Sequence, residues 1–208
     1  MQFTIQRKQL RAILNFAAVK DVRYYLNGVH VHQGHRGTIL EATDGHALGM
    51  LQIDDSPKPV DFCIIRTEHV KQLMGSKKDG NQYIDFNVSE SGDVTASACG
   101  LVYTFKKEDA AFPDTQRVTP KDSQEDGPAQ FDVNLLAKFA QCAIDLEVSK
   151  KGHFGLRHRG AKNPGLVDIG LDSFVGVVMP LRQETPAGIP PAWVHKPVID
   201  VKLEPVTA

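Results

Sequence analysis

Four histidines lie close enough together in the sequence to suggest metal chemistry. They are His30, His32, His35 and His46, and His30 and His32 point to the same face of any strand that contains both. Zinc sites are tetrahedral and combine imidazole with thiolate or carboxylate ligands, and we identify no neighbouring Asp, Glu or Cys that completes such a set. We therefore interpret His30 and His32 as strand residues that face solvent, and we expect neither a metal ion nor a cofactor.

The triplet Asp44-Gly45-His46 is the nearest approach to a catalytic dyad. A dyad needs a nucleophile and a group that orients the base, and we find neither beside this triplet. Asp followed by Gly is typical of a hairpin turn, which explains the triplet better. The sequence also has no glycine-rich phosphate loop, no GxSxG or HExxH motif and no paired Cys–His signature. We expect that the protein is not an enzyme.

The elements that must position these residues follow a repeated order of strand, helix and three strands. Helices are indicated by apolar residues three and four apart: Leu10, Ile13, Leu14 and Ala17; Val70, Leu73 and Met74; and Leu136, Phe139, Ala140 and Ala143. Alternating runs predict strands at 2–5, 24–32, 38–43 and 47–53, at 60–65, 82–88, 93–98 and 101–105, and at 129–133, 153–159, 165–170 and 173–180. The pattern predicts an α+β fold of three βαβββ units, with antiparallel sheets and with the helices on one face.

The composition of the 208 residues is that of an ordinary globular protein, with 41% hydrophobic and 24% charged residues. No apolar run reaches 18 residues, so we expect no membrane partner. Cys63, Cys99 and Cys142 are far apart, which argues against a disulfide framework and suits the reducing cytoplasm.

Basic residues recur on the side of each predicted helix that lies opposite its apolar residues. They are Arg7, Lys8 and Arg11, then Lys71, Lys77 and Lys78, and finally Lys138. Such a face would contact DNA phosphates without reading base sequence. A helix face that is merely solvated explains the same pattern. Because the net charge is −1, we expect any DNA binding to be weak and strongly dependent on salt.

Four segments resemble the bacterial DNA polymerase III beta subunit, the sliding clamp. They are DVRYYLNGV at 21–29, ATDGHAL at 42–48, FPDTQRVTP at 112–120 and VVMPLR at 177–182, and they occur in the order of that family. The first two units resemble the middle domain of the clamp, and the third resembles the second half of its last domain. The resemblance covers about residues 1–182. It implies a ring of βαβββ units whose helices face DNA and which tethers polymerase and repair proteins without catalysis.

The resemblance also implies a pocket for partner peptides at the junction of the middle and last domains. It assigns to this pocket Leu26, Thr43, Gly45, His46, Leu48, Pro113, Arg117, Val118, Val177, Val178, Met179, Pro180, Leu181 and Arg182. Aliphatic and Met side chains accept Leu or Phe anchors, and the two arginines suit a carboxylate or carbonyl at the rim. A plain core around a Pro-containing turn is the alternative. Ala47 departs from the family, which usually has a long basic residue there.

We divide the chain into a complete clamp-like domain at 1–120, a linker at 121–128, half a clamp-like domain at 129–182 and a Pro-rich tail at 183–208. The function expected is that of a shortened sliding clamp, a processivity factor for a DNA polymerase. Its partners would be duplex DNA, the polymerase and other clamp-binding proteins, with a clamp loader left open. An interaction protein that binds clamp partners without encircling DNA is the alternative, and a hydrolase with a histidine-bound metal is a more distant one.

Three units leave one unit without a partner inside the chain. An unpaired third unit would expose one sheet face and the helix stripe from Leu136 to Ala143, which soluble monomers rarely tolerate. Pairing the third units of two chains about a two-fold axis would cover them, and two such dimers would close a ring of four chains. A strand at 198–203 that folds onto the exposed edge would satisfy a monomer instead. We favour a homo-oligomer.

Overall fold

The computed structural model describes residues 2–34, 37–53, 63–108, 110–120, 129–158 and 160–182. In these residues the α-helices are α1 (Arg7–Leu14), α2 (Thr67–Leu73) and α3 (Val133–Asp145), and the 3₁₀ turns are η1 (Tyr24–Leu26), η2 (Lys77–Asp79) and η3 (Thr115–Arg117). The strands are β1 (Gln2–Gln6), β2 (Gly28–Gly34), β3 (Gly37–Thr43), β4 (Ala47–Gln52), β5 (Cys63–Arg66), β6 (Tyr83–Val88), β7 (Asp93–Ala98), β8 (Leu101–Lys106), β9 (Gly155–Arg157), β10 (Gly165–Asp168) and β11 (Phe174–Val178).

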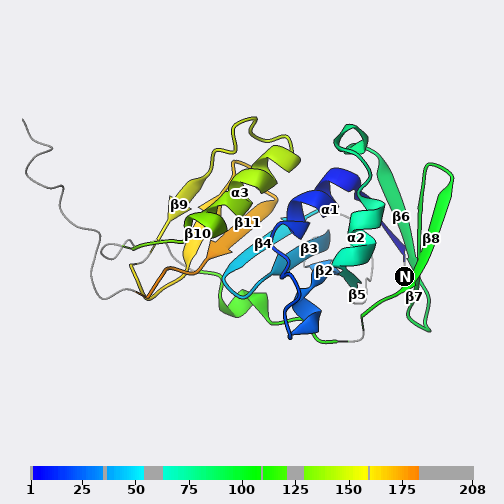
Figure 1. Ribbon diagram of the computed structural model, residues 1–208, viewed down its shortest axis with the longest axis horizontal. Helices are drawn as coiled ribbons and strands as arrows, with labels where there is room; N and C mark the ends of the chain where they lie inside the picture. The colour runs from blue at the N-terminus through cyan, green and yellow to red at the C-terminus, as the bar shows by residue number, and fades with distance from the viewer. Residues whose placement is uncertain are drawn as a thin grey trace, which may run out of the picture.

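The described strands form two antiparallel sheets. One has the order β1-β6-β7-β8, and the other has the order β5-β2-β3-β4-β11-β10-β9. The three helices lie on one face of the sheets (Figure 1). The α+β class and the helices on one face are therefore confirmed.

The first two units exchange their leading strands. β1 pairs with β6 of the second unit, and β5 pairs with β2 of the first. Each sheet is thus completed by a strand from the other unit, which locks the two units into one body. Alternating burial along β6, where Ile84, Phe86 and Val88 face inward, matches its period-2 pattern.

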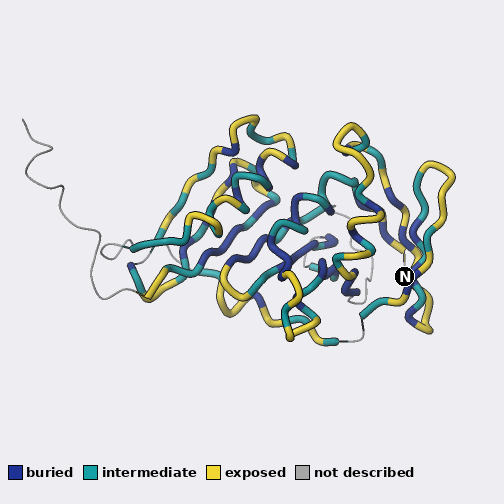
Figure 2. The backbone as a smooth tube through the Cα atoms, viewed as in Figure 1, coloured by how far each residue is buried: buried dark blue, intermediate teal, exposed yellow. Residues whose placement is uncertain are grey.

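The third unit continues the sheet of the first. β11 pairs with β4 in a register that places Leu48 opposite Val177. On the helix side of this sheet, the rings of Phe16 and Phe139 lie 4.9 Å apart. Figure 2 shows buried backbone running across this junction. One core therefore spans the first and third units.

The apolar stripe of α3 is covered, contrary to the expectation for an unpaired unit. Phe139, Cys142 and Ala143 are fully buried, and Leu136 is partly buried. The physical reason is that α3 packs both on its own strands and against α1. The third unit therefore has a core without a second copy.

The predicted strand at 153–159 is reduced to Gly155–Arg157, and two other predicted strands differ more from the structure. Residues 24–26 form η1 and the strand begins only at Gly28, because backbone bonds from Leu26 to Arg23 and from Asn27 to Tyr24 close a turn first. Residues 129–133 form no strand, since no described unit exchanges a strand with the third. The linker at 121–128 and the tail with its strand at 198–203 lie outside the described residues. No helix in the described part is long and apolar enough to span a membrane.

Candidate functional site

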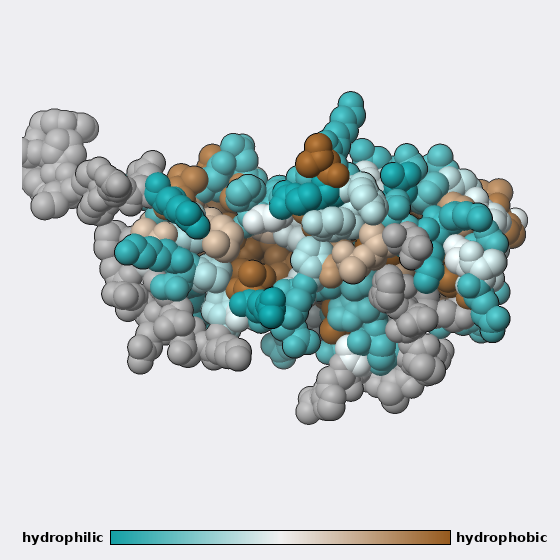
Figure 3. All heavy atoms as spheres, turned by 90° about the horizontal axis from the view of Figure 1, so that it is seen from below, coloured by the Kyte–Doolittle hydropathy of each residue, from teal (hydrophilic) through white to brown (hydrophobic). Residues whose placement is uncertain are grey.

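A hollow of about 190 Å³ lies where the first and third units meet. It is lined by Arg23, Tyr25, Leu26, Thr43, Gly45, His46, Ala47, Leu48, Pro113, Asp114, Thr115, Val118, Val177 and Met179. Apolar side chains gather near the middle of the corresponding face (Figure 3). Four segments far apart in the sequence thus build one site.

The floor of the hollow is the joint between β4 and β11. Leu48 and Val177 lie opposite each other in this joint, and both are almost fully buried, as is Leu26 from η1. Side chains of this kind accept an apolar anchor without giving up a hydrogen bond. The floor therefore favours an aliphatic or aromatic group.

A rigid turn at 43–47 forms one edge of the hollow. The Asp44 carboxylate accepts hydrogen bonds from the backbone N–H groups of His46 and Ala47, both at 2.8 Å. The Thr43 hydroxyl donates to the Ala47 carbonyl at 2.8 Å. Gly45 has a φ of +92°, a conformation that favours glycine. The turn predicted from Asp44-Gly45 is therefore confirmed, and it holds His46 exposed at the rim.

The same turn ties the first unit to the third. The Lys138 ammonium on α3 lies 2.5 Å from the Asp44 carboxylate. Burial alone would raise the pKa of Asp44, but the hydrogen bonds from Lys138 and from the backbone of Ala47 and His46 hold it below its usual range. The backbone N–H of Met179 also donates to the His46 carbonyl at 2.8 Å. The shape of the hollow thus depends on this junction.

Arg23 stands at the polar rim. Its guanidinium donates to both carboxylate oxygens of Asp21, at 3.0 and 2.7 Å, and to the carbonyl of Asp44 at 3.3 Å. The bonds from the Arg23 side chain, together with one from the Arg23 backbone N–H, lower the pKa of Asp21 to about 2. A fixed guanidinium at the mouth of an apolar hollow suits a ligand that carries carbonyl or carboxylate groups.

The far wall is the segment 112–118 around η3. The Thr115 hydroxyl donates to Glu41 on β3 at 2.7 Å, and the ring of Phe112 stacks on His30 at 4.6 Å. The Asp114 side chain caps η3 by accepting from the backbone of Gln116. These contacts hold Pro113 and Val118 against the hollow.

Most of the predicted pocket residues come together. The hollow includes Leu26, Thr43, Gly45, His46, Leu48, Pro113, Val118, Val177 and Met179. Arg117, Val178, Pro180, Leu181 and Arg182 do not line it. The Arg117 side chain is 84% exposed and lies 3.5 Å from Asp114, whereas Val178 is fully buried in the core. Arg23, Tyr25, Ala47, Asp114 and Thr115 were missed, although each is next to a predicted residue or within three positions of one.

The interpretation of His30 as a solvent-facing residue is wrong, and His32 is only partly exposed. His30 is 8% exposed, and its Nδ1 lies 2.7 Å from Oε1 of the buried Glu41. The register of β2 and β3 places Glu41 directly opposite His30, so an acidic residue does stand beside the pair. His46 is apart from them at the hollow, and His35 lies outside the described residues.

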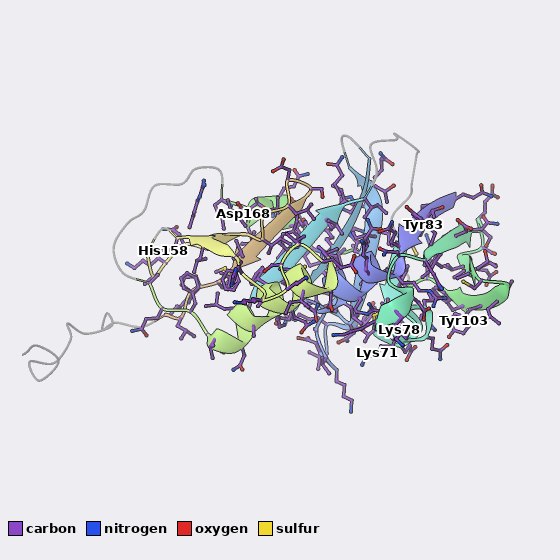
Figure 4. The ribbon with its side chains drawn as sticks, turned by 90° about the horizontal axis from the view of Figure 1, so that it is seen from above. Lys71, Lys78, Tyr83, Tyr103, His158 and Asp168 are labelled. Atoms are coloured by element: carbon purple, nitrogen blue, oxygen red, sulfur yellow. The ribbon has the colours of Figure 1, made fainter. Side chains whose placement is uncertain are left out.

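The predicted basic face is partly neutralised. Lys8 pairs with Glu147 at 3.1 Å, Arg7 lies 3.8 Å from Asp79, and Arg11 donates to the carbonyls of Met74 and Ser76. Lys138 on α3 also has an acidic partner, Asp44. The basic residues predicted on α1 and on α3 therefore all contact other groups of the chain. Lys71, Lys77 and Lys78 are exposed, and Figure 4 shows Lys71 and Lys78 on the helix side of the molecule.

Both the sequence and the fold of this chain are similar to those of known proteins. The beta sliding clamp of Salmonella typhimurium is 28% identical over 149 residues, which are 69% of this chain and 40% of that protein. The DNA polymerase III subunit beta of Pseudomonas aeruginosa has the same fold, with a TM-score of 0.67 at 18% identity over 88% of this chain and 67% of that one. A sliding clamp of Bartonella birtlesii bound to griselimycin gives a TM-score of 0.64 at 18% identity, with 88% and 66% covered. No model of a protein family matches the chain.

The chain thus resembles bacterial beta sliding clamps in sequence and shares their fold. It spans about 40% of the length of the curated relatives that it matches.

Proposed function

We propose that this protein is a shortened sliding clamp, a non-catalytic processivity factor that tethers partner proteins through the hollow between its first and third units. The observation that carries the proposal is the convergence at one hollow of segments 23–26, 43–48, 113–118 and 177–179. Its apolar floor and fixed polar rim are the features of a groove that binds a short peptide. The resemblance to beta sliding clamps supports the same function.

The occupant is a peptide that carries a Leu or Phe anchor beside a Gln. The anchor would rest on Leu48 and Val177, where burial of one such side chain contributes about 1.5–3 kcal/mol. The Gln amide would reach the rim, where the Arg23 guanidinium lies beside the turn at 43–47. The polymerase and other clamp-binding proteins would present such peptides.

Griselimycin provides a ready probe because a clamp with this fold is bound to it. Binding of griselimycin to the full chain is measured by isothermal titration calorimetry, and a Gln/Leu/Phe peptide is added as competitor. Leu48→Ala and Met179→Ala should each weaken binding by about 1–3 kcal/mol, the usual cost of removing a buried anchor. Val175→Ala, on the same strand as Val177 but outside the hollow, is the matched control. Unchanged affinity in both hollow variants would contradict the proposal.

The clamp function also needs assembly, and we propose that the third units of two chains pair. The exchange of β1 and β5 between the first two units supports this arrangement. In the third unit the equivalent residues 129–132 form no strand, and β9 is at the outer edge of its sheet. Residues 129–132 of a second copy would extend the sheet at β9, and the exchange would be reciprocal. The division into a complete domain at 1–120 and half a domain at 129–182 belongs to this proposal.

An interaction protein that binds clamp partners without encircling DNA is the second candidate. The neutralisation of Arg7, Lys8 and Lys138 by acidic partners favours it, because fewer cations are left to neutralise phosphates. Both candidates act in the cytoplasm, and both use the hollow. They differ in assembly and in DNA binding.

A further inference from the structure

The cluster formed by His30, His32 and Glu41 lies behind the wall of the hollow and takes no part in lining it. One potential ligand atom from each residue lies within 4.8 Å of the others. His30 Nδ1 is 2.7 Å and His32 Nε2 is 3.4 Å from the same carboxylate oxygen, Glu41 Oε1. We propose that these three side chains bind a zinc ion.

The sheet itself creates the arrangement. His30 and His32 are two residues apart on β2 and therefore share a face, and Glu41 is directly opposite His30 on β3. Zinc binds His nitrogen at 2.0–2.1 Å and carboxylate oxygen at 2.0–2.2 Å, so ligand atoms around a tetrahedral ion are about 3.3 Å apart. Binding of an ion would replace the hydrogen bond of 2.7 Å between His30 Nδ1 and Glu41 Oε1 and would turn the stacked rings of His30 and His32 toward a common point.

The hydrogen bonding of His32 is the observation that most favours a role as a metal ligand. Its Nδ1 is 3.3 Å from the carbonyl of Gln33, and a carbonyl can only accept, so this contact is a hydrogen bond in the tautomer that carries the proton on Nδ1. In a neutral ring, Nε2 then has a lone pair, and this buried atom has no hydrogen-bond partner among the described residues. This Nε2 lies 3.4 Å from Glu41 Oε1 with no hydrogen bond between the two atoms. A cation bound by both atoms would give Nε2 a partner.

The Nδ1–H bond to a backbone carbonyl is also the arrangement that usually orients a metal-binding histidine. The contact of His32 with the Gln33 carbonyl therefore suits a histidine whose Nε2 binds a metal ion.

The remaining contacts of the cluster are compatible with a bound ion. Glu41 uses its other oxygen, Oε2, to accept from Thr115, so an ion on the Oε1 side leaves that bond in place. Three protein ligands leave one position of the tetrahedron for water. The His32 side chain is 27% exposed, which gives the ion a way in. An ion here would stiffen the attachment of the 112–118 segment.

The test uses the full chain after treatment with a chelator. Zn²⁺ is titrated by calorimetry, Co²⁺ is added separately to record its visible absorption, and the metal content is measured after dialysis. We expect one zinc ion per chain, tetrahedral Co²⁺ bands and a rise in melting temperature on addition of zinc. His32→Ala should weaken zinc binding at least tenfold and abolish both the bands and the rise. His153→Ala, an exposed histidine far along the chain, should change none of them.

A cooperative thermal unfolding transition of metal-free His32→Ala would establish that this variant is folded. Glu41→Gln provides a second variant, which keeps the shape of the side chain. Absence of zinc binding in the unaltered chain, or equal binding in the unaltered chain and in folded His32→Ala, would overturn the proposal. The measurement needs no peptide or DNA, so its result does not depend on the proposed clamp function.

Discussion

Gly49 on β4 and Gly176 on β11 lie directly opposite each other in the sheet that joins the first and third units. The ring of Phe16 rests on Gly49 and the ring of Phe139 rests on Gly176, so a Cβ on either glycine would collide with a ring. The two rings are in turn 4.9 Å apart. Two glycines thus make room for the aromatic pair that holds the junction, and the junction forms the floor of the hollow.

Replacing either glycine should therefore loosen the junction. Gly49→Ala and Gly176→Ala should each lower the free energy of unfolding by about 1–3 kcal/mol, because the added methyl overfills a packed core. The measurement is urea unfolding followed by circular dichroism. Gly155→Ala is the control, since the nearest atom to its added Cβ would be 3.8 Å away. If Gly155→Ala lowered the free energy of unfolding as much as Gly176→Ala does, the packing described for the junction would be contradicted.

The ion pair between Lys138 and Asp44 should matter for both stability and shape. Both side chains are largely buried, at 23% and 17% exposed, so Lys138→Ala should lower the free energy of unfolding by about 1–2 kcal/mol, between the values for surface and buried pairs. It should also weaken griselimycin binding, because the 43–47 turn loses its tie to α3. Lys151→Ala, an exposed lysine beyond α3, is the control.

The same pair gives the stability a defined pH dependence. The pKa of Asp44 is lower in the folded protein than its ordinary value of 3.8, so its contribution is fully present above that value. The contribution is lost as the pH falls through the lowered pKa of the folded state. Unfolding curves of the unaltered chain and of Lys138→Ala should therefore converge in strong acid. A difference that stays constant with pH would contradict the assignment.

DNA binding should depend on the exposed lysines of the second unit rather than on α1. Lys71→Glu should weaken binding to duplex DNA and reduce the slope of log affinity against log salt by about 1, the effect expected when one phosphate contact is lost. Lys106→Glu is the control, because Lys106 follows the inward-facing Phe105 on β8 and points away from the core. Fluorescence anisotropy at several salt concentrations measures the DNA affinity of each variant and its dependence on salt. Equal loss in the two variants would contradict a DNA-binding helix face.

The sequence predicts the repeated elements well, because period and turn residues are local signals. The 43–47 turn follows from Asp44-Gly45, and the stripe of α3 from its spacing. The strand at 129–133 fails because alternation only indicates that a strand can form, whereas its existence depends on a partner strand.

The candidate site was only partly predictable for a similar reason. Segments of the hollow could be identified by resemblance, yet which side chains line it depends on contacts between distant segments. Thr115 reaches Glu41 across 74 positions of the chain, and Glu41 meets His30 only through the register of β2 and β3. No local pattern in the sequence predicts either contact.

The oligomeric mass of this chain tests most directly whether it works as an encircling clamp. Multi-angle light scattering over a range of concentrations measures the mass of the purified full chain. If the third units pair and two pairs close a ring, the mass should reach four times the 22.9 kDa of one chain. A mass of one chain that persists at high micromolar concentration would contradict the encircling clamp and leave the peptide-binding interaction protein as the function.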